Sequence, residues 1–273
     1  MPFLELSGKK VCKFYVQQGI MAAITTIDSI IGHQQQIRLL KTAVEHERVA
    51  HAYLFDGPEG IGKKLVAQFF ARIFLCESAN GCGHCSSCVK MAADSHPDFY
   101  SLQPDGTTIK IDQIRALQPQ LVLRSFAGRG KVCLIDSAEL MTHEAANALL
   151  KTLEEPTAGT LIILISSRPE GLLATIRSRC QRVRFNRLPR RELAQHLENT
   201  LAISAAEATV LAAVANGSFE KALGQHQDLY LKKRTDLIQS LSALSPTSSI
   251  QMLSLIHISS PRDRTRSRMP SSA

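Results

Sequence analysis

The sequence has no tryptophan, and aromatic residues make up only 5% of its 273 residues. Proteins that grip single-stranded nucleic acid stack bases on aromatic side chains, so a stand-alone nucleic-acid-binding module is disfavoured. No apolar run reaches the roughly 18 residues that a membrane helix needs. Residues 1–20 also lack the ordered regions of a secretory signal. We therefore expect a cytoplasmic protein with no membrane partner.

The net charge of +8 says little about function. Five of these charges lie in residues 1–20 and 253–273, which leaves only +3 for residues 21–252. The segment 253–273 changes abruptly to Ser, Arg and Pro, so we expect a non-native tail; a natural basic disordered tail is the alternative. Met21 begins a second plausible start, and residues 1–27 are accordingly assigned to an N-terminal extension.

Hydrophobic residues make up 44% of the chain, which is enough to bury a core. Short apolar runs alternate with helical patterns, and this order predicts an α/β fold with a parallel sheet. The predicted strands are the run before residue 57 and residues 98–103, 131–136 and 160–166. Helices are predicted at 29–50, after the loop at 57–62, and at 111–123 and 143–154. From residue 189 to about 226 the pattern is all-helical, which predicts a small second domain.

GPEGIGKK (57–64) follows a predicted strand and precedes a predicted helix. This is the context of a phosphate-binding loop, in which Gly57, Gly60 and Gly62 shape the backbone and Lys63 reaches the phosphates. Lys64 stands where Ser or Thr normally binds Mg²⁺, and an ammonium cannot coordinate a metal. We expect ATP to bind weakly or not at all.

The strand KVCLID ends at Asp136, where a nucleotidase of this architecture holds its metal. The next residue is Ser137 rather than a glutamate that polarises the attacking water, and serine has no useful basic group. Glu139 is expected on the following turn. Autonomous ATP hydrolysis is therefore not expected.

Four of the seven cysteines fall within 13 residues, at Cys76, Cys82, Cys85 and Cys88. Such clustering in a cytosolic chain favours a metal over disulfides. Four thiolates complete a closed, structural Zn²⁺ site; an iron–sulfur cluster or redox thiols are the alternatives. His84 and His96 lie nearby, but the cysteines already fill the coordination sphere.

Arg179 lies in IRSRC (176–180), on an expected loop after the strand at 160–166. It is either a solvated charge or an arginine finger that reaches a neighbouring subunit's γ-phosphate, a role for which the guanidinium fork is suited.

These motifs occur in order with SHPDF (95–99) and IDSAELMTHEAANALLKTLEEP (135–156). Together they resemble the δ′ family of bacterial DNA polymerase III clamp-loader subunits, within the AAA+ superfamily. The resemblance covers about residues 28–226. It implies an AAA+ α/β domain at 28–188 with a zinc module at 76–88, a helical lid at 189–226, and the start of a truncated helical collar at 227–252.

The resemblance also implies a stator-like subunit that supports ATP-dependent loading of the sliding clamp on primed DNA. Its partners would be the γ/τ and δ subunits, and it would belong to the DNA polymerase III holoenzyme. Arg179 would act in trans on a neighbour's ATP, Ser166 or Ser167 would occupy a sensor position, and Glu220 would replace a sensor arginine. The alternative is an ATP-hydrolysing γ/τ motor subunit, which should carry Thr or Ser after Lys63 and Glu after Asp136.

Overall fold

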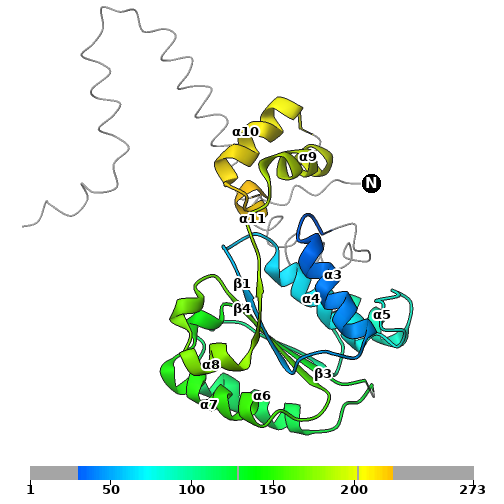
Figure 1. Cartoon of the computed structure of the whole chain (residues 1–273), viewed down its shortest axis with the longest axis vertical. Coiled ribbons are helices and arrows are strands. Elements are labelled where there is room, and N and C mark those ends of the chain that lie inside the picture. The colour runs from blue at the N-terminus through cyan, green and yellow to red at the C-terminus, as the bar shows by residue number, and fades with distance from the viewer. Residues whose placement is uncertain (1–29, 128, 202, 224–273) are drawn as a thin grey trace, which may run out of the picture. The chain divides into compact units, whose positions relative to one another are not determined.

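The computed structural model describes residues 30–127, 129–201 and 203–223 (Figure 1). Within them, five parallel strands form one sheet in the order β2-β3-β4-β1-β5. The strands are β1 (Ala52–Asp56), β2 (Phe99–Leu102), β3 (Lys131–Ile135), β4 (Thr160–Ser166) and β5 (Gln181–Arg184).

Helices precede, connect and follow the strands. The α-helices are α3 (Gln34–Glu45), α4 (Lys63–Leu75), α5 (Ser86–Ala92), α6 (Ile111–Val122), α7 (His143–Glu154), α8 (Ala174–Arg179), α9 (Arg190–Leu201), α10 (Ala205–Ala215) and α11 (Phe219–Leu223). Two 3₁₀ turns, η3 (Ala138–Leu140) and η4 (Pro169–Gly171), follow β3 and β4. In this described part, no helix is long and apolar enough to cross a membrane.

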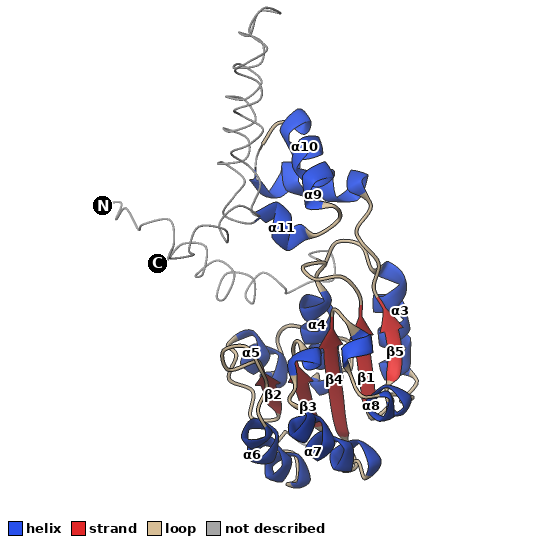
Figure 2. Cartoon of the chain, turned by 90° about the vertical axis from the view of Figure 1, so that its left-hand side faces the viewer, coloured by secondary structure: helices blue, strands red, loops and turns tan. Residues whose placement is uncertain are grey.

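The central strands are buried on both faces, which explains their continuous apolar sequences. Because successive side chains point to opposite faces, Phe55 and Leu134 enter one core while Leu54 and Cys133 enter the other. Helices α3, α4 and α5 supply the first core, and α6, α7 and α8 supply the second (Figures 1 and 2). The sheet is thus the middle of three layers.

The strand order brings three functional segments to one edge of the sheet. β4 lies between β1 and β3, and Asp56 at the end of β1 pairs in register with Ser166 at the end of β4. The loop after β1, Asp136 after β3 and Ser166 therefore meet at the carboxyl ends of neighbouring strands. Ligands of open α/β sheets bind at such an edge.

Most predicted elements are confirmed, with shifts at their ends. The predicted helix 29–50 is α3 (Gln34–Glu45), and the predicted strand 98–103 is β2 (Phe99–Leu102). Glu139 lies on η3, as expected. The placement of Arg179 on a loop is wrong, because it is the last residue of α8.

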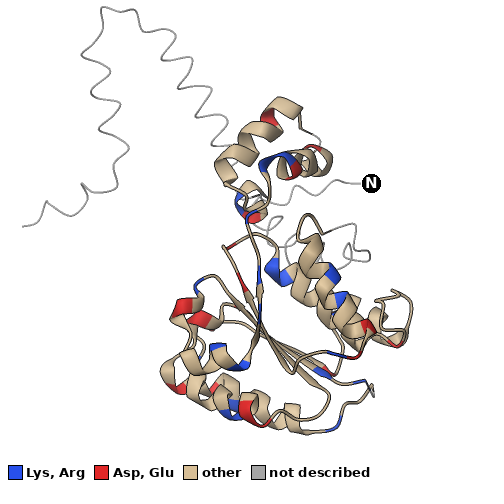
Figure 3. Ribbon diagram, in the orientation of Figure 1, with Lys and Arg blue, Asp and Glu red and all other residues tan. Residues whose placement is uncertain are grey.

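β5, α5 and the 3₁₀ turn η4 were also not predicted from the sequence. β5 buries only Val183, so it has no apolar run, and α5 lies within the cysteine cluster. Figure 3 shows basic and acidic residues interspersed along the described elements, in keeping with a nearly neutral folded part. The expectations for residues 1–27, 227–252 and 253–273 lie outside the described residues.

Candidate functional site

The loop between β1 and α4 has the backbone of a phosphate-binding loop. Gly60 and Gly62 have φ angles of 73° and 96°, a left-handed conformation that favours glycine. Gly62 is the N-cap of α4, and its carbonyl accepts the first helical hydrogen bond from the Val66 amide at 3.1 Å. The three predicted glycines and Lys63 are therefore brought together at the N-terminus of α4, where backbone N–H groups and the helix dipole favour an anion.

The Lys63 side chain is turned back onto its own loop. Its Nζ donates to the carbonyl oxygens of Gly57 and Pro58, each at 2.6 Å, and the residue is only 6% exposed. Burial lowers the pKa of Lys63 below its ordinary value. Nearby carboxylates, Glu139 and Asp136 first among them, act in the opposite direction but do not outweigh burial. The ammonium that should meet the phosphates is held by carbonyl groups of the protein.

Lys64 forms an ion pair with Asp136. The Lys64 Nζ lies 3.1 Å from the Asp136 Oδ2, and the two side chains are 37% and 23% exposed. Asp136 is fixed in place because its amide donates to the Leu102 carbonyl at 2.9 Å. In P-loop nucleotidases, the residues at these two positions together hold Mg²⁺. In this chain the Lys64 ammonium instead places a positive charge next to the Asp136 carboxylate.

The acidic residue closest in sequence to Asp136 is engaged elsewhere. The Glu139 Oε1 accepts hydrogen bonds from the Ser167 amide at 3.0 Å and from the Ser167 hydroxyl at 2.5 Å. Burial would raise the pKa of Glu139, but hydrogen bonds, that from the Ser167 side chain first among them, outweigh it and lower the pKa. Ser137, which follows Asp136 and is the N-cap of η3, takes a left-handed backbone conformation, with φ 53°. Glu139 thus joins η3 to the end of β4 as a carboxylate.

Helix α11 approaches the phosphate-binding loop. The Glu220 amide donates to the Gly60 carbonyl at 3.1 Å. A Cβ atom added at Gly60 would lie 2.4 Å from the Ser218 Oγ and 3.1 Å from the Glu220 Oε2. Gly60 is therefore required both by its φ angle and by this close approach. The Glu220 carboxylate therefore lies beside the phosphate-binding loop, where its negative charge would repel a phosphate.

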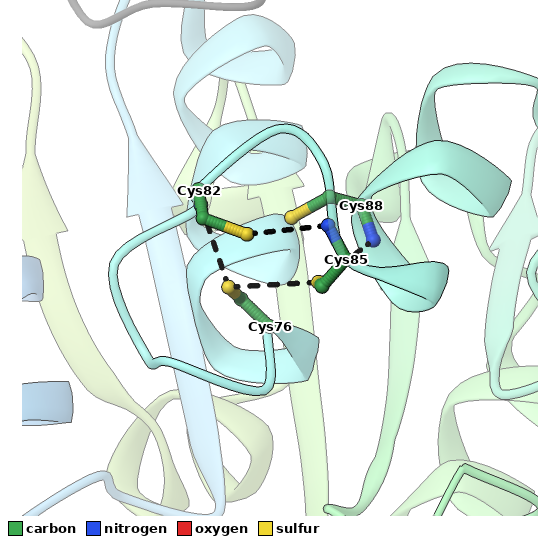
Figure 4. A group of neighbouring side chains, drawn as sticks. All are labelled: Cys76, Cys82, Cys85 and Cys88. Atoms are coloured by element: carbon green, nitrogen blue, oxygen red, sulfur yellow. Dashed lines mark hydrogen bonds between the residues drawn. The ribbon is translucent and has the colours of Figure 1, made fainter.

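The four clustered cysteines meet as the spacing predicts (Figure 4). Their sulfur atoms all lie within 4.8 Å of one another, and the Cys76 and Cys85 sulfurs are 3.9 Å apart. That separation is far beyond a disulfide bond of about 2.05 Å. It matches the sulfur–sulfur edge of about 3.8 Å in a tetrahedron with Zn–S bonds of about 2.3 Å. The donor set and its geometry therefore fit a tetrahedral metal ion.

Backbone amides support the cluster. The amides of Cys82, Cys85 and Cys88 donate to the sulfurs of Cys76, Cys82 and Cys85 in turn, each at 3.4 Å. Burial would raise the pKa of Cys76, but backbone hydrogen bonds, led by Cys82, lower it to about 6, whereas burial raises the pKa of Cys88 to about 12. Hydrogen bonding of this kind favours the thiolate, which is the form that binds a metal.

Arg179 lies at the end of α8 and is 36% exposed. Its Nη2 is 2.8 Å from the Glu154 Oε1, and its Nη1 donates to the Thr175 carbonyl at 3.0 Å. Both contacts are made with residues of α7 and α8, two of the helices that supply the second core. The guanidinium is accordingly oriented by α7 and α8 rather than by the phosphate-binding loop.

Two contacts of the site were not predicted from the sequence. Lys64 was identified only as unable to bind a metal, although its charge next to a predicted acidic site was the signal for the pair with Asp136. The second is Arg182, whose guanidinium binds the Asp56 carboxylate at 2.5 Å and joins β5 to β1.

A profile of the family described as "DNA polymerase III, delta subunit" matches residues 32–189. DNA polymerase III subunit delta′ of Bacillus subtilis is 36% identical over 210 residues, which are 76% of this chain and 64% of that protein. The delta′ subunit of Pseudomonas aeruginosa is 46% identical over 136 residues, 48% of this chain and 42% of that protein. The chain thus spans less than two thirds of the length of these relatives.

Subunit tau of Bacillus subtilis is a weaker match, 29% identical over 234 residues that cover 83% of this chain and 41% of that protein. Among solved structures, the RuvB Holliday junction branch migration motor of Thermotoga maritima aligns with a TM-score of 0.51 and 16% identity, over 87% of this chain and 73% of that chain. At this identity the likeness concerns the fold alone.

Proposed function

The chain belongs to the delta′ family of DNA polymerase III clamp-loader subunits, and we propose that it acts as a stator, completing a neighbouring subunit's ATP site without hydrolysing ATP itself. Its partners are the γ/τ and δ subunits. Through the assembled complex it supports loading of the sliding clamp on primed DNA, in the bacterial cytoplasm. It thereby serves the DNA polymerase III holoenzyme without carrying out nucleotidyl transfer.

The ion pair between Lys64 and Asp136 carries this proposal. A motor subunit needs its P-loop hydroxyl and its acidic residue for Mg²⁺, which neutralises the developing charge on the transferred phosphoryl group. In this chain the first group is a lysine and the second is bound to it. Ser137 and Glu220 add two departures from a working ATPase. ATP binding by this loop is therefore weak or absent.

Arg179 is the residue that we propose acts in trans. Its exposure and its fixed position at the end of α8 suit a group that reaches out of the subunit. An arginine stabilises the charge of a phosphoryl-transfer transition state with a permanent positive charge and several donors. The contact with Glu154 involves two half-exposed side chains, so exchanging it for a nucleotide costs little.

We propose zinc as the metal of the cysteine cluster. Cys76, Cys82, Cys85 and Cys88 would hold it, with no open position for a substrate. When bound, the ion supplies folding free energy rather than catalysis. Helices α9, α10 and α11 are proposed as the lid, since α11 contacts the loop through Glu220.

The γ/τ motor is the less favoured assignment, because Lys64 and Ser137 occupy two positions where it needs other residues. Reconstitution of clamp loading with the full-length protein tests the proposal. Omitting the protein should abolish loading of a fluorescent clamp on primed DNA, and adding it back should restore loading. The isolated protein should not hydrolyse ATP. Full loading in its absence, or rapid ATP hydrolysis by the isolated chain, would overturn the stator assignment.

A further inference from the structure

Arg72 is a charged residue buried beside the cysteine cluster. It lies in the last turn of α4 and is only 7% exposed. Its backbone carbonyl accepts from the Cys76 amide at 3.0 Å, so the helix that carries Arg72 leads directly into the first cysteine. A buried guanidinium is unfavourable unless negative charge lies close to it.

The Arg72 side chain contacts the cysteine segment at two places. Burial raises the pKa of the Cys88 thiol to about 12, and the nearby Arg72 side chain opposes this rise as a hydrogen-bond donor. The Arg72 Nη2 lies 3.0 Å from the position that a Cβ atom would take at Gly83, between the second and third cysteines. The guanidinium therefore lies beside the cysteine segment, next to Gly83.

The charge of a metal-bound cluster explains this placement. Four thiolates around Zn²⁺ carry a net charge of −2, whereas four neutral thiols carry none. A buried cation next to the sulfurs therefore favours the metal-bound, thiolate state, because like a hydrogen-bond donor it stabilises negative charge on sulfur. The amides that donate to the other sulfurs supply only partial charges.

A second arginine lies near the cluster but does not share this role. The Arg129 Nη1 donates to the carbonyl oxygens of Cys76 and Glu77, at 2.6 and 2.7 Å. These are neutral backbone acceptors, and Arg129 is exposed. Of the two, Arg72 is the residue whose charge is buried and lies beside the loop between Cys82 and Cys85.

We propose that Arg72 is a positioning residue for the zinc ion, holding Cys88 and offsetting the double negative charge of the tetrathiolate. The inference rests on the proposed zinc. Partners of metal ligands that lie outside the coordination sphere commonly change metal affinity 10–100-fold when substituted. Arg72 should therefore slow zinc release as well as stabilise the fold.

The test uses the full-length protein with Arg72→Met, which keeps length and removes charge, and Arg72→Lys, which keeps charge. Arg115→Met, at an exposed position of α6, is the control. Zinc content is measured first; then zinc release to excess chelator is followed with a chromogenic indicator. Melting temperatures are recorded with zinc bound and after zinc removal under reducing conditions.

Arg72→Met should release zinc about tenfold faster or more, while Arg72→Lys and Arg115→Met stay within about threefold of the unchanged protein. Arg72→Met should also lower the melting temperature more with zinc bound than after its removal, because the zinc-free protein has less negative charge for the guanidinium to offset. A residue that only fills space would lower both equally. Should Arg72→Met fail to fold, a folded Arg72→Lys with slow zinc release still supports the proposal.

Three results would overturn it. The first is zinc release by Arg72→Met at the unchanged rate. The second is zinc release by Arg72→Lys as fast as by Arg72→Met. The third is an Arg72→Lys variant that does not fold, since charge would then not be what the site requires. Each of these leaves the zinc assignment intact. An unchanged protein that folds without zinc would instead remove the zinc assignment and the role of Arg72 together.

Discussion

The Lys64 ammonium lies 3.1 Å from the Asp136 carboxylate, so a side chain of the protein supplies positive charge where a P-loop nucleotidase holds a divalent ion. The pair joins the first turn of α4 to the end of β3. Its electrostatic contribution to stability is small, at most about 1 kcal/mol for partly exposed side chains. Its effect on ligand binding is larger, because a lysine and a magnesium ion compete for the same carboxylate.

Lys64→Thr should make nucleotide binding depend on Mg²⁺. The substitution removes the competing ammonium and restores the hydroxyl that normally binds the ion. We expect the unchanged protein to bind a fluorescent ATP analogue equally poorly with Mg²⁺ and with EDTA. The variant should bind at least about fivefold more tightly with Mg²⁺, roughly 1 kcal/mol.

Lys64→Met is the control, because it breaks the ion pair without adding a hydroxyl, and it should show no Mg²⁺ dependence. Tight Mg²⁺-dependent binding by the unchanged protein would show that Lys64 does not exclude the ion.

Lys63→Ala should leave clamp loading within about twofold of the unchanged protein. In this structure Lys63 donates to the Gly57 and Pro58 carbonyls, so its removal takes a contact from the loop and none from a phosphate. Loading of the clamp on primed DNA by the reconstituted complex is the measurement. A large loss of clamp loading in the Lys63→Ala variant would contradict this expectation and show that the loop binds a nucleotide during loading.

Cys85→Ser should destabilise the protein and lower its zinc content from about one ion per chain. Loss of a structural metal removes folding free energy, and we expect the melting temperature to fall on the order of 5–10 °C, at 2–4 °C per kcal/mol. Metal analysis and thermal unfolding are measured on the same samples. His84→Gln is the matched control, since the exposed His84 is not required once four cysteines bind the ion. Equal zinc content and melting in Cys85→Ser would reject the site.

Asp98→Asn should lower the free energy of unfolding by about 2 kcal/mol. The Asp98 carboxylate is fully buried and accepts from the Phe126 amide at 2.9 Å and the Ala127 amide at 2.8 Å. An asparagine keeps one acceptor and turns an NH₂ group toward the other amide. Urea unfolding measures the change, with Asp94→Asn as an exposed control. An Asp98→Asn variant as stable as the control would show that the two hydrogen bonds contribute nothing.

Most of the sheet and the cysteine cluster were predictable because their signals are local. β3 and β4 are continuous apolar runs, and the cysteine spacing alone brings four sulfurs together. β5 was not predicted, because an edge strand with one buried residue has no such run. The pair of Lys64 with Asp136 joins segments that are distant in the sequence, and the burial of Arg72 depends on how the cysteine segment folds back onto α4. Hydrophobic periodicity reveals neither.

The stator account is tested most directly by Arg179→Ala in the full-length protein, assembled with hydrolysis-competent γ/τ subunits and δ. The measurement is clamp- and DNA-stimulated ATP turnover, with assembly checked by size-exclusion chromatography. Arg177→Ala, on the same helix, is the control. The account predicts that Arg179→Ala lowers turnover at the neighbouring site by at least about tenfold, given the large effect of arginine fingers, while the complex stays assembled. Unchanged turnover in an assembled complex would contradict it and make Arg179 a surface charge paired with Glu154.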